Sequence, residues 1–187
     1  IRESGDHLLG LVNDILDLSA LHAGQLRGDF STIDLVDIAR AVLDEAEGQL
    51  REKPVRLVAQ FERERLPLRG VPRLLRRVLQ NLVGNALKFT QRGEVRLAAR
   101  CEGSEDVVVV SDTGPGIAAD ALLAIFEEYR QTGDVRTKRE GTGLGLHISK
   151  RIVSEMGGSL DVESQAGTGS TFRVRLPAWR ESSEGAK

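Results

Sequence analysis

The sequence predicts an α+β fold of two layers, in which about five strands form a sheet and helices cover one of its faces. Two observations support this. Apolar residues recur at three- and four-residue steps in some segments, and they alternate or run together in others. Glycine-rich stretches separate these segments, and no unit repeats along the chain. One amphipathic helix precedes the predicted sandwich.

That preceding helix is predicted from a single apolar stripe in residues 1–26. A helix of this kind buries nothing by itself, so it needs a partner helix or a second chain. We therefore predict three parts: a helical unit over 1–26, a main domain over 27–180 and a flexible tail over 181–187. The stripe consists of Leu8, Leu11, Val12, Ile15, Leu18 and Leu21.

Helices and strands of the main domain follow from local signals. Asp34 can cap a helix from Leu35 to about Leu50, and Pro72 can begin another. A short helix is expected over 118–129, and a further helix follows "GTGLGL" and ends at a Gly-Gly pair. Strands are expected in "VRLVAQF", "EVRLAARC", "DVVVVSD" and, as a hairpin, "SLDVESQAGTGSTFRVRLP". The run of valines predicts a central, buried strand.

The charge balance and cysteine content exclude several classes of function. The 26 basic and 28 acidic side chains give 187 residues a net charge of −2, which gives no electrostatic case for nucleic-acid or anionic-membrane binding. Cys101 is the only cysteine, so no internal disulfide forms and a reducing compartment fits. No apolar run approaches the roughly 18 residues of a membrane span. A cytoplasmic location is expected, with membrane anchoring of the parent protein left open.

The stretch "NLVGNALKFT" places polar side chains along a helix that is otherwise apolar. At about 100° per residue, Asn81, Asn85 and Lys88 fall within an arc of about 60°. Amide oxygens can coordinate Mg²⁺, and an ammonium can face a phosphate. A solvated polar face is the alternative interpretation. The neighbouring apolar arc contains Val78, Leu82, Ala86 and Phe89, extended by Leu79 and Val83.

Glycine-rich motifs add a second group of candidate residues. Asp112 ends the valine-rich strand, where its carboxylate can accept a hydrogen bond from the adenine amine, and Gly114 and Gly116 follow it. With Ala119 this stretch also satisfies G-x-G-x-x-A, but no second βαβ unit follows to support a dinucleotide site. "GTGLGL" enters a helix whose N-terminal amides suit a phosphate. "GTGSTF" is equally well explained as a plain glycine turn.

Taken in order, "NLVGNALKFT", "DTGPGI", "IFEEYRQ", "GTGLGL" and "GTGSTF" resemble the boxes of the ATP-binding domain of bacterial sensor histidine kinases. The resemblance spans Asp34 to Pro177. It implies the Bergerat (GHKL) fold, a mixed sheet with ATP held between the helix of the first box and a lid over 130–141. It also implies that residues 1–26 are the second helix of a dimerisation and phosphoacceptor hairpin whose acceptor helix is absent from this fragment.

The resemblance assigns roles residue by residue. Asn81 and Asn85 would hold Mg²⁺ and, with Lys88 at the phosphates, form the catalytic group. The implied partners are a second copy of the chain, bound through the hairpin, and the receiver domain of a response regulator. The implied ATP-binding residues are Asn85, Lys88, Asp112, Gly114, Gly116, Ile117, Phe126, Tyr129, Gln131, Gly141, Thr142, Gly143, Leu144, Gly145, Leu146 and Thr171.

None of the three histidines, His7, His22 and His147, lies in the family's acceptor motif. The expected function is transfer of the γ-phosphoryl group of Mg-ATP to a histidine outside this fragment and then to a regulator aspartate. The fragment alone is expected not to phosphorylate itself. One alternative is a GHKL-type ATP hydrolase, but Arg77 stands where those enzymes have a glutamate that activates water. The other is a degenerate domain that binds nucleotide or only a partner.

Overall fold

A computed structural model describes residues 30–50, 53–122, 124–126 and 144–179 of the chain. The helix and the tail predicted for 1–26 and 181–187 lie outside these described residues. The elements are β1 (Ser31–Asp34), α2 (Leu35–Leu50), β2 (Val55–Phe61), β3 (Pro67–Gly70), α3 (Pro72–Phe89), β4 (Gly93–Glu102), β5 (Glu105–Asp112), the 3₁₀ turn η2 (Ala124–Phe126), α4 (Gly145–Glu155), β6 (Ser159–Gln165) and β7 (Gly169–Pro177).

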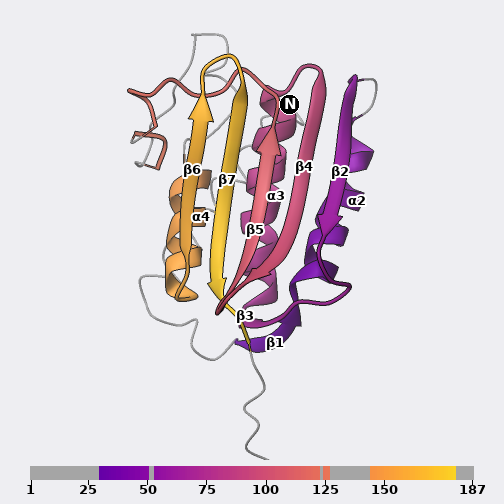
Figure 1. The fold of residues 1–187 in the computed structure, drawn as a ribbon, viewed down its shortest axis with the longest axis vertical. Helices are drawn as coiled ribbons and strands as arrows, with labels where there is room; N and C mark the ends of the chain where they lie inside the picture. The colour runs from indigo at the N-terminus through magenta and orange to yellow at the C-terminus, as the bar shows by residue number, and fades with distance from the viewer. Residues whose placement is uncertain (1–29, 51–52, 123, 127–143, 180–187) are drawn as a thin grey trace, which may run out of the picture.

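Five strands form the main sheet in the order β2-β4-β5-β7-β6. β2 runs parallel to β4, and every other neighbouring pair is antiparallel, so the sheet is mixed. Helices α2, α3 and α4 cover one face, with α3 packed between the other two (Figure 1). The predicted two-layer fold is confirmed, and the valine-rich strand β5 is the central one, as predicted.

The apolar arc of α3 packs onto this sheet, which explains most of the sequence pattern. Leu79, Leu82 and Val83 are at most 1% exposed. Phe89 was predicted on the same face, but that prediction is wrong because its side chain is 40% exposed. It is the last residue of α3, where the helix meets the glycine loop after β5 and no longer packs on the sheet.

The structure differs from the sequence prediction in two further short elements. The helix predicted over 118–129 is, within the described residues, a set of turns that ends in η2. Two of its backbone bonds, Ala121 N to Ala118 O and Ala124 N to Ala121 O, span three residues as in a 3₁₀ helix, and a single bond, Ile125 N to Ala121 O, spans four, so no continuous α-helix forms. The small antiparallel sheet of β1 and β3 was not predicted, because each strand has only four residues.

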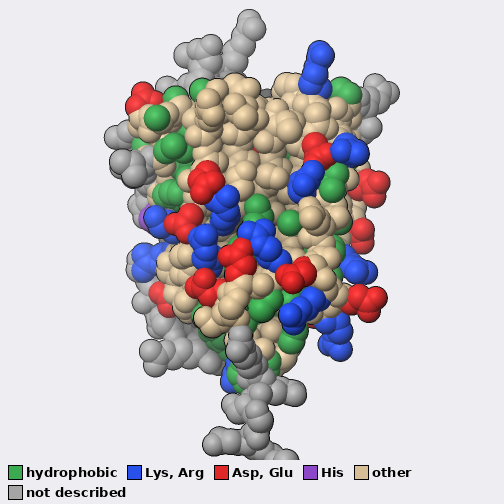
Figure 2. Space-filling model, in the orientation of Figure 1, with side chains coloured by type: hydrophobic (Ala, Val, Ile, Leu, Met, Phe, Trp, Pro, Cys, Tyr) green, Lys and Arg blue, Asp and Glu red, His purple; other side chains and the backbone are tan. Residues whose placement is uncertain are grey.

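The face of the main sheet opposite the helices is open and carries interspersed acidic and basic side chains (Figure 2). Cross-strand ion pairs join Arg56 to Glu94 and Arg175 to Asp161. Val107 on this face is still fully buried, because its partners on the neighbouring strands are Arg100 and Arg175. The central strand is therefore buried on both faces. Among the described residues, no helix is both long and apolar enough to cross a membrane.

Asp34 joins the small sheet to α2. Its Oδ1 accepts hydrogen bonds from the backbone N–H of Val36 at 3.0 Å and of Leu66 at 3.1 Å, and Oδ2 accepts from Arg65 Nε at 2.9 Å. The predicted helix cap is thus confirmed. Burial alone would raise the pKa of Asp34, but the bonds from Leu66, Arg65 and Val36 outweigh it and hold the pKa below its ordinary value of 3.8.

We predict that Asp34→Asn lowers the free energy of unfolding by about 1.5–3 kcal/mol at pH 7, the range for hydrogen bonds to a charged group. A depressed pKa stabilises the fold above the unfolded-state pKa, and this contribution is lost as pH falls through the folded-state value. The difference between the two proteins, measured by urea denaturation, should therefore shrink below about pH 4. A difference that is constant from pH 7 to pH 3 would contradict this account of the carboxylate.

Candidate nucleotide site

Asp112, predicted as the adenine ligand, ends the central strand β5 on the face that the helices cover. Its Oδ1 accepts a hydrogen bond from the Gly114 backbone N–H at 2.8 Å, and the Ser170 N–H also donates to the carboxylate. Burial raises the pKa of Asp112 above its ordinary value, against the opposing effect of these two bonds. The carboxylate is therefore fixed in position and only partly solvated.

The glycine loop after β5 is held against the turn between β6 and β7. Gly167 N–H donates to Pro115 O at 2.7 Å, and Ile117 N–H donates to Ser164 Oγ at 2.8 Å. The same Ser164 hydroxyl donates to Gly169 O at 2.7 Å. Ser164 thus ties together the loop, the end of β6 and the start of β7. Sequence reasoning did not single out this serine.

Two glycines are required because backbone meets backbone at this junction. A Cβ on Gly116 would lie 2.0 Å from Gln165 O, and one on Gly169 would lie 2.0 Å from Asp112 O. Both also have positive φ, +66° and +126°, which side chains rarely adopt. These glycines therefore serve the contact between the loop and the hairpin, in addition to any contact with a ligand.

Gly114 brings the backbone of the loop close to two polar groups. A Cβ there would lie 2.8 Å from Asp112 Oδ1 and 3.3 Å from Thr90 Oγ1. Thr90 is fully buried, and its hydroxyl has no hydrogen-bond partner among the described residues. A carboxylate and a buried hydroxyl beside a glycine match the amine and ring nitrogens of a purine. Thr90 ends the quoted helix motif, but no sequence signal singles it out.

The row of polar side chains on α3 faces the start of α4. Asn81 Nδ2 donates to Ser149 Oγ at 3.0 Å, and Asn85 Nδ2 lies 3.4 Å from Asn81 Oδ1. Gly145 permits this approach, since a Cβ there would lie 2.4 Å from Asn81 Oδ1. The structure therefore brings Asn81, Asn85 and Gly145 together, as their predicted common site requires.

Lys88 and the N-terminus of α4 are the groups at this site that suit a phosphate. The Lys88 ammonium lies 5.3 Å from the centre of the Phe89 ring, at the end of α3 nearest the glycine loop. α4 begins without a side-chain cap on its N-cap residue Leu144. Its first backbone N–H groups can donate hydrogen bonds to an anion, and the helix dipole favours a negative charge there.

Phe126 of η2, predicted to anchor a lid, is held by two side chains of α4. His147 Nδ1 lies 3.1 Å from the Phe126 carbonyl oxygen, which can only accept a hydrogen bond. The Lys150 ammonium lies 4.6 Å from the centre of the Phe126 ring. This contact gives His147, which lies in no acceptor motif, a positioning role at Phe126.

Other predicted site residues are placed differently. Thr171 pairs with Ser111 and Glu163 on the open face of the sheet, whereas its neighbour Ser170 pairs with Asp112 on the helix-covered face. The Thr171 side chain therefore points away from Asp112. Leu144 is 1% exposed and belongs to the core, and Leu146 is partly buried against it. Tyr129, Gln131, Gly141, Thr142, Gly143 and the predicted lid over 130–141 lie outside the described residues.

No group of three or more His, Cys, Asp or Glu side chains in the described part of the chain could hold a metal ion. Among the described residues, the amide oxygens of Asn81 and Asn85 are the candidates for a cation at this site. A hard cation such as Mg²⁺ would need further ligands and negative charge, which nucleotide phosphates supply. The donor set therefore fits a magnesium ion that arrives with its nucleotide.

A mixed sheet covered on one face, with this constellation at one end, defines a class of nucleotide-binding domains. Residues 70–180 match the family model described as "Histidine kinase-, DNA gyrase B-, and HSP90-like ATPase". The chain belongs to this family, and the description supports ATP as its class of ligand.

Curated relatives are sensor kinases. The chain is 37% identical over 193 residues to the sensor protein GacS of Pseudomonas syringae pv. syringae, covering 98% of the chain and 21% of that protein. It is 39% identical over 181 residues to the sensor protein TorS of Escherichia coli K12, covering 95% of the chain and 19% of that protein. The chain thus spans about a fifth of the length of these relatives.

Solved structures agree. Full-length ShkA in complex with AMPPNP superposes with a TM-score of 0.83 and 34% identity, covering 97% of this chain and 38% of that one. The catalytic domain of the histidine kinase ThkA superposes with a TM-score of 0.71 and 26% identity, covering 80% of this chain and 97% of that one.

We predict that Gly116→Ala destabilises the domain far more than Gly167→Ala. Both positions have positive φ, +66° and +83°, so each substitution carries the cost of about 1–2 kcal/mol of a left-handed backbone. Only Gly116 adds a clash, because nothing lies within 4 Å of a Cβ on Gly167. Chemical denaturation should show an additional loss of about 1–3 kcal/mol for Gly116→Ala. Equal losses would contradict the close contact with Gln165.

Proposed function

We propose that this chain is the ATP-binding catalytic domain of a two-component sensor histidine kinase. The observation that carries the proposal is the position of Asp112: it lies beside the orphaned Thr90 hydroxyl at a glycine loop pinned by the β6–β7 turn. Near the same end of the helical layer, the row Asn81, Asn85 and Lys88 runs beside the open N-terminus of α4. The family and its sensor-kinase relatives support the same assignment.

Adenine recognition would use the fixed carboxylate. Asp112 accepts a hydrogen bond from the exocyclic amine of adenine, a bond that guanine, with a carbonyl oxygen there, cannot donate. Gly114 places no side chain beside this carboxylate, and the Thr90 hydroxyl offers a second polar contact. The side chain of Ser170, and not that of Thr171, is on the correct face to support this pocket.

The triphosphate would lie toward α3 and α4. Lys88 neutralises phosphate charge, and the N-terminal N–H groups of α4 donate to phosphate oxygens. Asn81 and Asn85 would hold Mg²⁺ through their amide oxygens, and the ion would supply positive charge that neutralises the phosphates. Tyr129, Gln131 and the glycines Gly141 and Gly143 stay predicted contributors.

The reaction breaks the bond between the γ-phosphorus and the bridging oxygen and forms a bond from phosphorus to an imidazole nitrogen, so that ADP leaves with the bridging oxygen. The chain's own residues act by position and charge, because phosphoryl transfer depends on little else. The phosphohistidine would then donate to an aspartate of a response-regulator receiver domain. In this scheme residues 1–26 form the second helix of the hairpin that pairs two copies of the kinase.

Rapid hydrolysis by the alternative GHKL route finds little support. Arg77, one helical turn before Asn81, cannot serve as a base. In the described chain the carboxylate that contacts this part of α3 is Glu45, which accepts hydrogen bonds from Arg76 and from Gln80 at 2.7 Å. The hydrogen bond from Gln80 lowers the pKa of Glu45 most, and the bond from Arg76 lowers it further. Glu45 is therefore a weak base.

We predict that Asp112→Asn weakens ATP binding by about 10- to 150-fold, since a hydrogen bond to a charged group is worth about 1.5–3 kcal/mol. The matched control is Asp106→Asn, a second acid on the same face of β5, which burial also gives a raised pKa but which lies at the other end of the strand. Calorimetry with ATP and GTP should show a loss in the first variant alone. Unchanged ATP affinity in Asp112→Asn would remove this residue from the site.

We also predict that the 187-residue chain binds ATP without labelling itself. Incubation with γ-labelled ATP should give no acid-labile protein phosphate, because none of the three histidines stands in an acceptor motif. Addition of a chain that carries an acceptor hairpin should produce label on the added chain. Strong labelling of His7 in the chain alone would refute this prediction and the assignment of residues 1–26.

A further inference from the structure

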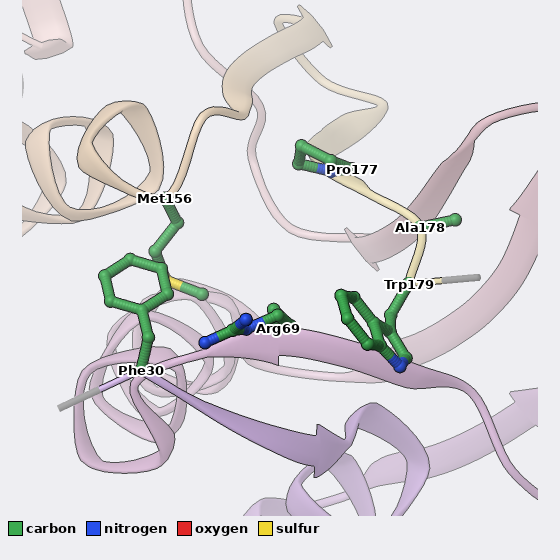
Figure 3. Close-up of a pocket in the computed structure, with 6 residues that line it drawn as sticks. All are labelled: Phe30, Arg69, Met156, Pro177, Ala178 and Trp179. Carbon is green, nitrogen blue, oxygen red and sulfur yellow. The ribbon is translucent and has the colours of Figure 1, made fainter. Parts of the chain in front are cut away.

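An apolar pocket lies at the pole of the domain opposite the candidate nucleotide site. It has a volume of about 460 Å³ and is lined by Phe30, Arg69, Met156, Pro177, Ala178 and Trp179 (Figure 3). β5 and α3 end at the nucleotide site, whereas β1, β3 and the end of β7 lie at this other pole (Figure 1). The site described above does not use this pocket.

The walls of the pocket are fixed by packing between three elements. Gly70 at the end of β3 lies against Met156, because a Cβ there would be 2.4 Å from the Met156 terminal methyl carbon. Ala178 bridges Leu68 of β3. The one charged lining group is also engaged, since the Arg69 guanidinium lies 5.5 Å from the centre of a Trp179 ring. The pocket is therefore a preformed apolar surface.

Both ends of the described main body of the chain meet here: Phe30 opens it, and Trp179 closes it. The residues after Trp179 read "RESSEGAK" and contain no large apolar side chain. The residues before Phe30 read "LHAGQLRGD" and contain Leu21 and Leu26. Of these two flanking stretches, the preceding one supplies the large apolar side chains that suit the pocket.

Reach and pocket size favour this segment over a separate molecule. Leu26 is four residues from Phe30, so its Cα stays within about 14 Å, and Leu21 stays within about 30 Å. A stable interface between separate proteins buries more than about 1,000 Å² in total, which six lining residues do not supply. A tethered segment needs far less, because its effective concentration is on the order of millimolar.

We propose that Leu26 docks into this pocket and holds the segment before the domain against this pole. When the segment is docked, it fixes the direction in which residues 1–26 leave the domain. When the segment is released from the pocket, the domain can turn relative to these residues. This function as a coupling between helix and catalytic domain rests on the proposed kinase function, whereas the docking itself does not.

Trp179 is the only tryptophan in the chain and lines the pocket, so its fluorescence reports on the occupant directly. In the full 187-residue chain, Leu26→Glu should shift the emission of Trp179 to the red and increase its quenching by acrylamide. Gln25→Glu, which adds the same charge one residue earlier, should change neither, and Leu26→Met should keep the wild-type emission. Identical spectra for the two glutamate variants would overturn the proposal.

A cross-link tests the contact without an added charge. In a Cys101→Ser background, Leu26→Cys paired with Ala178→Cys should form an intramolecular disulfide faster than Gln25→Cys paired with Ala178→Cys. Equal rates, or cross-links that join two chains and depend on protein concentration, would overturn the seat and assign the pocket to a second copy.

ATP titration of the same variants separates this proposal from the proposed function. Leu26→Glu should bind ATP as the wild type does, since the pocket lies at the far pole. A wild-type chain that fails to bind ATP would refute the proposed function, and the fluorescence result would still decide the seat.

Discussion

The site depends on one contact between distant parts of the chain: the glycine loop after β5 lies directly on the turn between β6 and β7. At Gly116 the backbone meets Gln165, and at Gly169 it meets Asp112, each too closely for any side chain. The Ser164 hydroxyl then accepts from the loop and donates to the turn. Because the hairpin holds the loop, the Asp112 carboxylate has its orientation before any ligand arrives, so binding need not order it.

The sequence predicted the elements well, because their signals are local. A run of valines indicated the central strand, and Pro72 and Asp34 marked the starts of two helices that the structure confirms. The sequence-based prediction failed where the pairing of distant segments decides the structure. β1 and β3 are each too short to carry a pattern, and they find each other only across more than thirty residues. Phe89 fitted the helical arc, but the arc says nothing about where the sheet ends.

The same limit explains the candidate site. Asn81, Asn85, Lys88 and Asp112 were selected by residue type and spacing, and the structure places them on the helical layer or on the face that it covers. Choosing Ser170 instead of Thr171 requires the register of β7 against β5, because side chains alternate faces with every residue and the sequence does not show the register. Thr90 lies close to Gly114, and Ser164 binds the backbone of Ile117. These neighbours are far away in the chain, so no spacing rule could select the two residues.

The two poles of the domain perform different physical tasks. At one pole, glycines let backbone segments and polar side chains approach one another closely, and the charged and amide groups gathered there suit an anionic ligand with a flat ring. At the other, apolar groups from the first and last described residues surround a pocket that the preceding segment can reach. α3 and the central strand join the poles through a fully buried core, and closely packed interiors move as rigid bodies. A change in how the segment seats at one pole would therefore reorient the nucleotide site as a unit, without altering its internal geometry.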